Sequence, residues 1–104
     1  MTSDASLDRA LHAIADPTRR RILLVLKERG NETKSAAEKP LHGACLCGGD
    51  IEERIRLSQP TISHHMNVLT KAGLVEAMKR GQWRWYRRNE KAIREIVKTL
   101  RGKL

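Results

Sequence analysis

A short helix, a tight turn and a second helix, followed at once by two strands, is the pattern that most constrains how this chain folds. Ile51 and Ile55 stand four positions apart, the spacing of one helix face. Asp50 and Glu53 stand three positions apart, as in a capping box, and predict that the first helix begins at Asp50. The pattern predicts that this helix ends near Arg56.

Ser58 is expected to cap the second helix, because Ser is favoured at that position and Pro60 is tolerated in a first turn. One face of this helix, which spans about residues 59–72, is apolar: Ile62, Met66 and Leu69. At about 100° per residue, four polar side chains fall toward the opposite side: Ser63, His64, Asn67 and Lys71. Such a pair of helices is typical of a helix-turn-helix, whose second helix lies in the DNA major groove.

Two strands are expected next, at residues 74–78 and 82–88, about a turn at residues 79–81. In the second strand Trp83 and Trp85 alternate with charged and polar residues, as in a half-buried strand. A hairpin with a basic tip, directly after a recognition helix, is a wing. The expected fold class is α+β and mostly α, a winged helix-turn-helix with a two-stranded β wing.

Further helices are expected on both sides of this unit. Apolar residues at helical spacing predict helices at about residues 6–15, from Asp16-Pro17 to Gly30, and over 90–104. Residues 31–49 show no sustained period and hold three glycines and both cysteines, so we expect a long loop there. A length of 104 residues fits one domain, spanning residues 1–104.

The positive charge of the chain is concentrated in its second half. Residues 1–50 carry 8 Lys and Arg against 7 Asp and Glu, whereas residues 51–104 carry 13 against 5. Most of the net charge of +9 therefore lies in the half that holds the expected recognition helix and wing. A basic field of this kind is typical of proteins that bind the phosphate backbone of nucleic acids.

Other classes of protein fit the sequence poorly. The longest apolar run, Ile22 to Leu26, is far shorter than a membrane span, and no secretory leader is seen, so we expect a cytoplasmic protein without a membrane partner. A glycine-rich phosphate loop and a His-Glu-x-x-His zinc motif are both missing, and neither cysteine has an evident orienting base. We therefore expect no enzymatic activity and no required cofactor.

Four segments together resemble the ArsR/SmtB family of bacterial winged-helix repressors. They are ADPTRRRIL at residues 15–23, LSQPTISHHM at 57–66, AGLV at 72–75 and RGQWRWY at 80–86. The resemblance implies a homodimer built from the first and last helices, a pseudo-palindromic operator in double-stranded DNA, and release of that DNA when an effector binds. The expected dimer contacts are Leu7, Leu11, Ile93, Ile96, Val97 and Leu100.

The resemblance and the polar face of the recognition helix together define the expected DNA contacts. From the recognition helix they are Ser58, Gln59, Thr61, Ser63, His64, Asn67 and Lys71. From the wing they are Lys79, Arg80, Gln82 and Arg84. His65, at the edge of the apolar face, is expected to pack near the core, because neighbouring helical residues point about 100° apart.

Cys45 and Cys47 are the expected sensing residues. Family members detect metals or metalloids through a Leu-Cys-x-Cys-Asp-Leu motif, and here Cys47 takes the first Cys position while Gly49 replaces the second. The effector would be As(III), Sb(III) or another thiophilic metal ion, or an oxidant that joins the two sulfurs. Inert cysteines and a metal shared with the partner subunit are the alternatives. The family's zinc site on the last helix is expected to be absent, because residues 90–104 hold no His.

Two rival functions also fit the sequence. A constitutive regulator would bind DNA with no response at the cysteines. A non-specific nucleic-acid binder would fit the same charge and helix pattern, but it would show no preference for one duplex sequence.

Overall fold

The structure, a computed structural model, describes residues 3–30 and 45–104. Two helices open the chain: α1 (Asp4–Ile14) and α2 (Pro17–Arg29). Asp16 separates them, and its carboxylate caps α2 by accepting hydrogen bonds from the backbone amides of Thr18 (2.7 Å) and Arg19 (3.1 Å). Within the described ranges, no helix is both long and apolar enough to cross a membrane.

The helix-turn-helix consists of α3 (Gly48–Ile55) and α4 (Gln59–Lys71). Arg56 ends α3 in a left-handed conformation (φ 62°), which turns the chain sharply toward α4. Ser58 caps α4 through a hydrogen bond from the Thr61 amide to its hydroxyl oxygen (3.4 Å). The helix-turn-helix prediction is confirmed.

The predicted start of α3 at Asp50 is wrong. The N-cap residue is Cys47, and Asp50 is the third residue of the helix. The Asp50 carboxylate accepts a hydrogen bond from the backbone N–H of Cys47 at 3.1 Å. The spacing of Asp50 and Glu53 could not distinguish the two positions, because Asp is favoured both as a cap and in the first turn of a helix.

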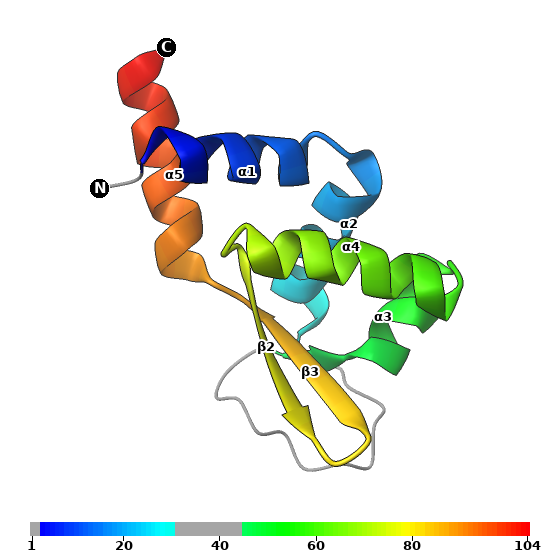
Figure 1. Cartoon of the computed structure of the whole chain (residues 1–104). Helices are drawn as coiled ribbons and strands as arrows, with labels where there is room; N and C mark the ends of the chain where they lie inside the picture. Colours follow the sequence, from blue (N-terminus) through cyan, green and yellow to red (C-terminus); the bar gives the residue numbers. More distant parts are fainter. Residues whose placement is uncertain (1–2, 31–44) are drawn as a thin grey trace.

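The wing hairpin consists of β2 (Val75–Arg80) and β3 (Trp83–Arg88). Its turn is Gly81-Gln82, because Gly81 accepts the positive φ of 59° that a tight hairpin turn requires. Lys79 and Arg80 were predicted to lie in the turn, but they belong to β2. Figure 1 shows the hairpin projecting away from the helices.

A third strand, β1 (Leu46–Cys47), was not predicted. It pairs antiparallel with β3, placing Leu46 opposite Tyr86 and Cys47 opposite Trp85, so the sheet order is β1-β3-β2. Residues 45–49 were predicted as the end of a long loop, but Leu46 and Cys47 form a strand and Gly48 and Gly49 begin α3. The rest of that predicted loop, residues 31–44, lies outside the described residues.

The core lies between α1, α2, α3, α4 and the sheet, and its fully buried side chains are mostly aliphatic: Ile22, Leu26, Leu46, Ile51, Met66 and Leu69. The last helix, α5 (Glu90–Lys103), begins at the cap residue Asn89 and contacts α1 (Figure 1). In this arrangement the core fixes the buried face of α4 and leaves its opposite face uncovered.

Candidate nucleic-acid interface

The recognition helix α4 presents two kinds of surface. Ile62, Met66 and Leu69 are buried in the core, as the sequence pattern predicted. The polar residues Gln59, His64, Asn67 and Lys71 are exposed, and Ser63 is half-buried. Since a helix that reads base edges needs free donors and acceptors on its outer face, α4 is equipped for that role.

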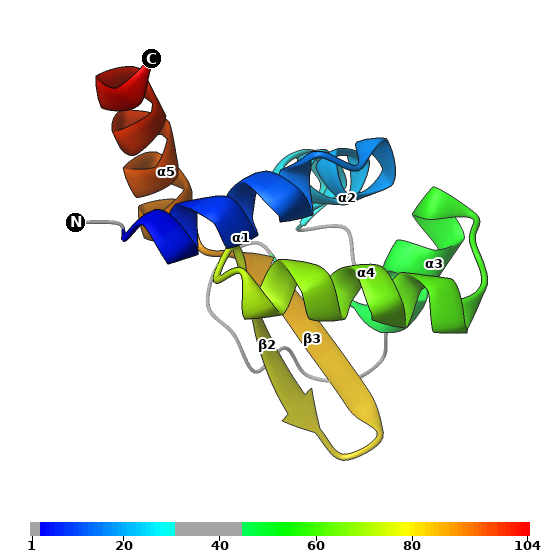
Figure 2. The same cartoon turned by 45° about the horizontal axis from the view of Figure 1, so that its top comes forward.

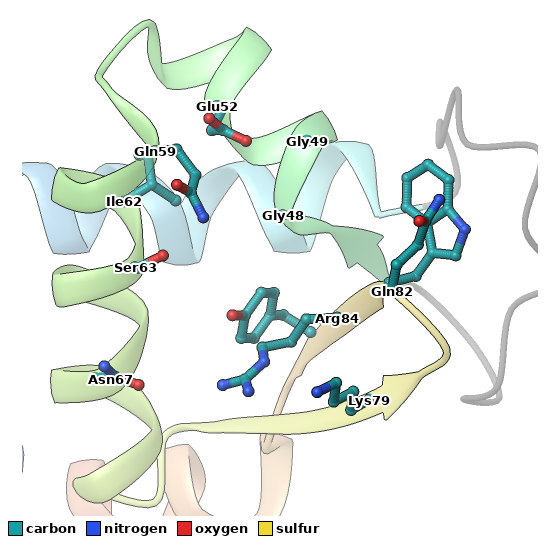
Figure 3. Close-up of a pocket in the computed structure, with 12 residues that line it drawn as sticks. Gly48, Gly49, Glu52, Gln59, Ile62, Ser63, Asn67, Lys79, Gln82 and Arg84 are labelled. Atoms are coloured by element: carbon teal, nitrogen blue, oxygen red, sulfur yellow. The ribbon is translucent and has the colours of Figure 1, made fainter.

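A groove of about 550 Å³ separates α4 from the wing. Figure 3 shows Gln59, Ser63 and Asn67 along one side of α4, facing Lys79 and Arg84 of the hairpin. Six of the predicted DNA contacts line this groove: Gln59, Ser63, Asn67, Lys79, Gln82 and Arg84. The tertiary structure thus brings together residues from two separate parts of the sequence.

The remaining predicted contacts lie elsewhere. Ser58 and Thr61 bond to each other through their side chains at the start of α4 (2.9 Å), and His64 lies on the outward face of that helix. Lys71 lines a shallow recess between α1 and α4. Arg80 pairs with Trp83 across the hairpin, one register position beyond the Lys79 and Arg84 pair, and therefore points to the other face of the sheet.

Lys79 and Arg84 stand directly opposite each other across the hairpin. Cross-strand partners share one face, and like charges so placed repel. Within the described residues, neither of these two cations forms an ion pair with a carboxylate. An anion in the groove would relieve this repulsion, and a phosphate of the DNA backbone is such an anion.

Glu52 and Tyr86 also line the groove and were not predicted as site residues. Tyr86 is buried, and burial raises the pKa of its hydroxyl while the neighbouring Arg84 partly opposes that shift. Its position was indicated only by strand alternation, which places Tyr86 and Arg84 on one face of β3. No pattern in the sequence indicated that Glu52 lies at this groove.

The two cysteines are buried beside the hairpin, with Cys47 in the strand that pairs with β3, and are not exposed in a loop. Cys45 and Cys47 form a small cluster with Trp85, against which Trp83 packs. The Cys47 thiol donates to Asp50 Oδ2 at 3.2 Å. Burial raises the pKa of Cys47, and the nearby carboxylate of Asp50 raises it further, so the protonated thiol is favoured. In the described part of the chain, no three His, Cys, Asp or Glu side chains are grouped to hold a metal ion.

The residues predicted for dimerisation divide into two groups. Leu7 and Ile96 are buried in the core of the chain itself, and Ile93 and Leu100 pack partly against it. Leu11 and Val97 are exposed, by 37% and 61%. The packing of α5 against α1 within one chain explains why some of these residues are buried and others are exposed. It covers part of the apolar face of each helix and leaves the rest open.

Comparisons with known proteins agree with this geometry. The profile of the family described as bacterial regulatory protein, arsR family, matches residues 41–77. An HTH-type transcriptional regulator of Methanocaldococcus jannaschii is 40% identical over 86 residues, covering 83% of this chain and 81% of that protein. The transcriptional repressor SdpR of Bacillus subtilis is 32% identical over 91 residues, covering 88% and 84%.

A shorter match and a solved structure extend the comparison. The arsenical resistance operon repressor of Staphylococcus aureus is 40% identical over 55 residues, which are 53% of each chain. The structure of an ArsR-like transcriptional regulator from Rhodococcus sp. RHA1 is similar with a TM-score of 0.71 at 28% identity, covering 94% of this chain and 78% of that one. The chain belongs to the ArsR family of bacterial regulatory proteins and is a transcriptional regulator.

Proposed function

We propose that this regulator is a repressor that recognises one double-stranded DNA sequence through α4 and the wing. The observation that carries the proposal is the groove in which polar side chains of α4 face the cations of the hairpin. The amide of Asn67 and the hydroxyl of Ser63 suit base edges, whereas Lys79 and Arg84 suit phosphates. Such a division of roles provides both sequence preference and affinity.

A homodimer is part of this proposal. The exposed residues Leu11 on α1 and Val97 on α5 lie on the two helices that contact each other within the chain. A second copy that covers this surface would place two copies of α4 on one duplex, related by a two-fold axis. Sedimentation of the intact chain measures the oligomeric state directly.

Asn67→Ala should lower affinity for the preferred duplex about 10-fold, because a bidentate amide-to-base contact is worth about 1–3 kcal/mol. The preferred duplex is the one that the protein enriches from a random pool. Affinity for an unselected duplex should change little, since Asn67 would contribute nothing to phosphate binding. Fluorescence anisotropy with both duplexes measures the difference.

Lys79→Ala, on the opposite side of the groove, is the comparison variant. Loss of a phosphate contact should weaken binding to both duplexes by similar factors and flatten the salt dependence. Failure of the wild-type protein to enrich any duplex would contradict sequence-specific binding and favour the non-specific alternative. Equal losses on both duplexes for Asn67→Ala would contradict base recognition by this residue.

Release of DNA by a thiophilic agent is the second candidate function. The relatives named as arsenical resistance operon repressors favour it, and so does the buried pair formed by Cys45 and Cys47. Arsenous acid reacts with two thiols to form two As–S bonds, and the two thiol protons leave with two hydroxyl groups of the acid as two molecules of water. Reaction at Cys47 would remove the thiol hydrogen bond to Asp50 at the start of α3, the helix that packs against α4.

Arsenite should therefore release the preferred duplex from the wild-type protein but not from the double variant Cys45→Ser/Cys47→Ser. Iodoacetamide is the comparison reagent: alkylation of the folded protein should be slow at neutral pH and faster as pH rises, because the pKa of Cys47 is raised. Mass spectrometry measures alkylation, and anisotropy measures release. Unchanged DNA binding in arsenite would leave both cysteines with a structural role alone.

A further inference from the structure

Arg19 is a buried arginine, only 7% exposed, at the corner between α1 and α2. Its guanidinium donates hydrogen bonds to the carbonyl oxygens of Ala13 (2.6 Å) and His12 (3.2 Å) in the last turn of α1. Asp16 Oδ2 lies 4.0 Å from its Nη1 atom. These contacts use the side chain to tie α1 to the start of α2.

The same guanidinium reaches the recognition helix. Nη1 of Arg19 lies 3.1 Å from Nδ1 of His65 on α4. Since a guanidinium has donors but no acceptor, Nδ1 of His65 must accept this hydrogen bond. The imidazole is therefore neutral, with its proton on Nε2.

His65 is well placed to transmit this contact to the DNA-binding face. It is half-buried on the side of α4 that faces α1 and α2, and it lies between exposed His64 and buried Met66 in the sequence. The three helices α1, α2 and α4 contact one another (Figure 2). The hydrogen bond from Arg19 to His65 is a polar contact in an otherwise largely apolar packing, so it fixes rotation and register as well as distance.

We propose that Arg19 and His65 are positioning residues that hold α4 in its DNA-reading orientation, and that protonation of His65 breaks this contact and weakens binding to the preferred duplex. The inference rests on the proposed function of α4 as the DNA-reading helix. Protonated imidazole has no acceptor nitrogen for the Arg19 hydrogen bond. Its positive charge would also place a second cation beside Arg19.

The charged groups around His65 determine the direction of the effect. Burial lowers the pKa of His65; the cation of Arg19 from α2 and the ring of His64 on α4 lower it too, whereas the carboxylate of Asp16 raises it. On the α1 side, the backbone carbonyl oxygens of Ala13 and His12 accept hydrogen bonds from Arg19. The pKa of His65 in the folded chain is below its ordinary value of 6.5. As the pH falls, the unfolded chain therefore takes up a proton at His65 before the folded chain does. The hydrogen bond from Arg19 to His65 is thus retained at neutral pH and lost on acidification.

Two substitutions separate positioning from simple packing. His65→Ala removes the acceptor and should lower affinity for the preferred duplex about 10-fold at neutral pH, the usual effect of losing a hydrogen bond to a charged group. His65→Asn places a carbonyl oxygen near the position of Nδ1 and should retain affinity to within about twofold. Circular dichroism melts show whether each variant is folded at the temperature of the assay.

The pH profile is the readout that a packing role would not change. At constant ionic strength, wild-type affinity should stay constant from about pH 8 to neutrality and fall as the pH is lowered below 6.5, whereas the affinity of His65→Asn should not fall. Because added positive charge by itself strengthens binding to phosphates, the predicted fall is opposite to the general electrostatic trend. Two-bond ¹H–¹⁵N spectra of the wild-type imidazole should show the Nε2–H tautomer.

The outcomes distinguish this inference from the proposed function. A wild-type protein that prefers no duplex at pH 8 would overturn the function. A protein that prefers one duplex but shows the same pH profile with His65 and with Asn at this position would overturn the inference alone. The inference would also be overturned if His65→Ala lowered the melting temperature but left the affinity of the folded protein unchanged.

Discussion

The double variant Lys79→Ala/Arg84→Ala should bind every duplex, preferred or not, on the order of 10- to 100-fold more weakly than the wild-type protein. The two side chains face α4 across the groove, and they are cross-strand partners. Each removed cation should also reduce the slope of log affinity against log salt by about 1. Anisotropy titrations at several salt concentrations measure both quantities.

The control variant is Lys91→Ala/Arg94→Ala, which removes one Lys and one Arg from α5. It loses the same charge but lies outside the groove, so it should change affinity and salt slope much less. The wing variant should keep or raise its melting temperature, because removing two opposed cations relieves about 0.2–1 kcal/mol of repulsion. Similar losses from the two variants would show that net charge, and not the groove, governs binding.

Trp85→Ala should destabilise the chain by about 3–5 kcal/mol, the usual cost of removing a large buried aromatic side chain. Trp85 is fully buried (0% exposed) on the central strand β3, opposite Cys47 of β1 and Met78 of β2. Its removal leaves a cavity that joins all three strands. Because domains of this size have about 5–15 kcal/mol of stability, the loss is a large part of the total. Urea denaturation measures it.

Two further variants test the origin of this effect. Trp85→Phe should cost clearly less, since among the described residues the indole N–H of Trp85 has no hydrogen-bond partner, and Phe removes that unsatisfied donor. Trp83→Ala should also cost less, because Trp83 is only half-buried. Trp85→Ala should in addition make Cys45 and Cys47 more reactive toward iodoacetamide. A change in stability below about 1 kcal/mol for Trp85→Ala would contradict its assignment to the buried cluster with Cys45 and Cys47.

The elements of this fold were largely predictable because the information for them is local. The second helix begins at Asp16-Pro17 and Ser58 caps α4, both as expected, and Gly81 lies in the wing turn. The apolar face of α4, with Ile62 and Met66, is buried as its spacing predicted. Caps, turns and helix faces depend on residues within one or two turns of each other, which a single sequence displays directly.

The surroundings of the cysteines were not predictable in this way. Residues 45–49 lack a helical or strand period, and only pairing with the distant β3 makes Leu46 and Cys47 a strand. That pairing buries both thiols against Trp85 and makes Cys47 the cap residue of α3. The chemistry of a thiol depends on burial and neighbouring charge, so a motif alone could not define it.

The sequence by itself determined the helix-turn-helix, the wing and the polar outer face of α4, because periodicity and capping are properties of neighbouring residues. Only the tertiary structure decided that Lys79 and Arg84 face Asn67 across one groove, that Glu52 and Tyr86 join them, and that Arg19 is buried against His65. These juxtapositions depend on how helices and strands pack, and packing is set by the shape and burial of side chains far apart in the chain.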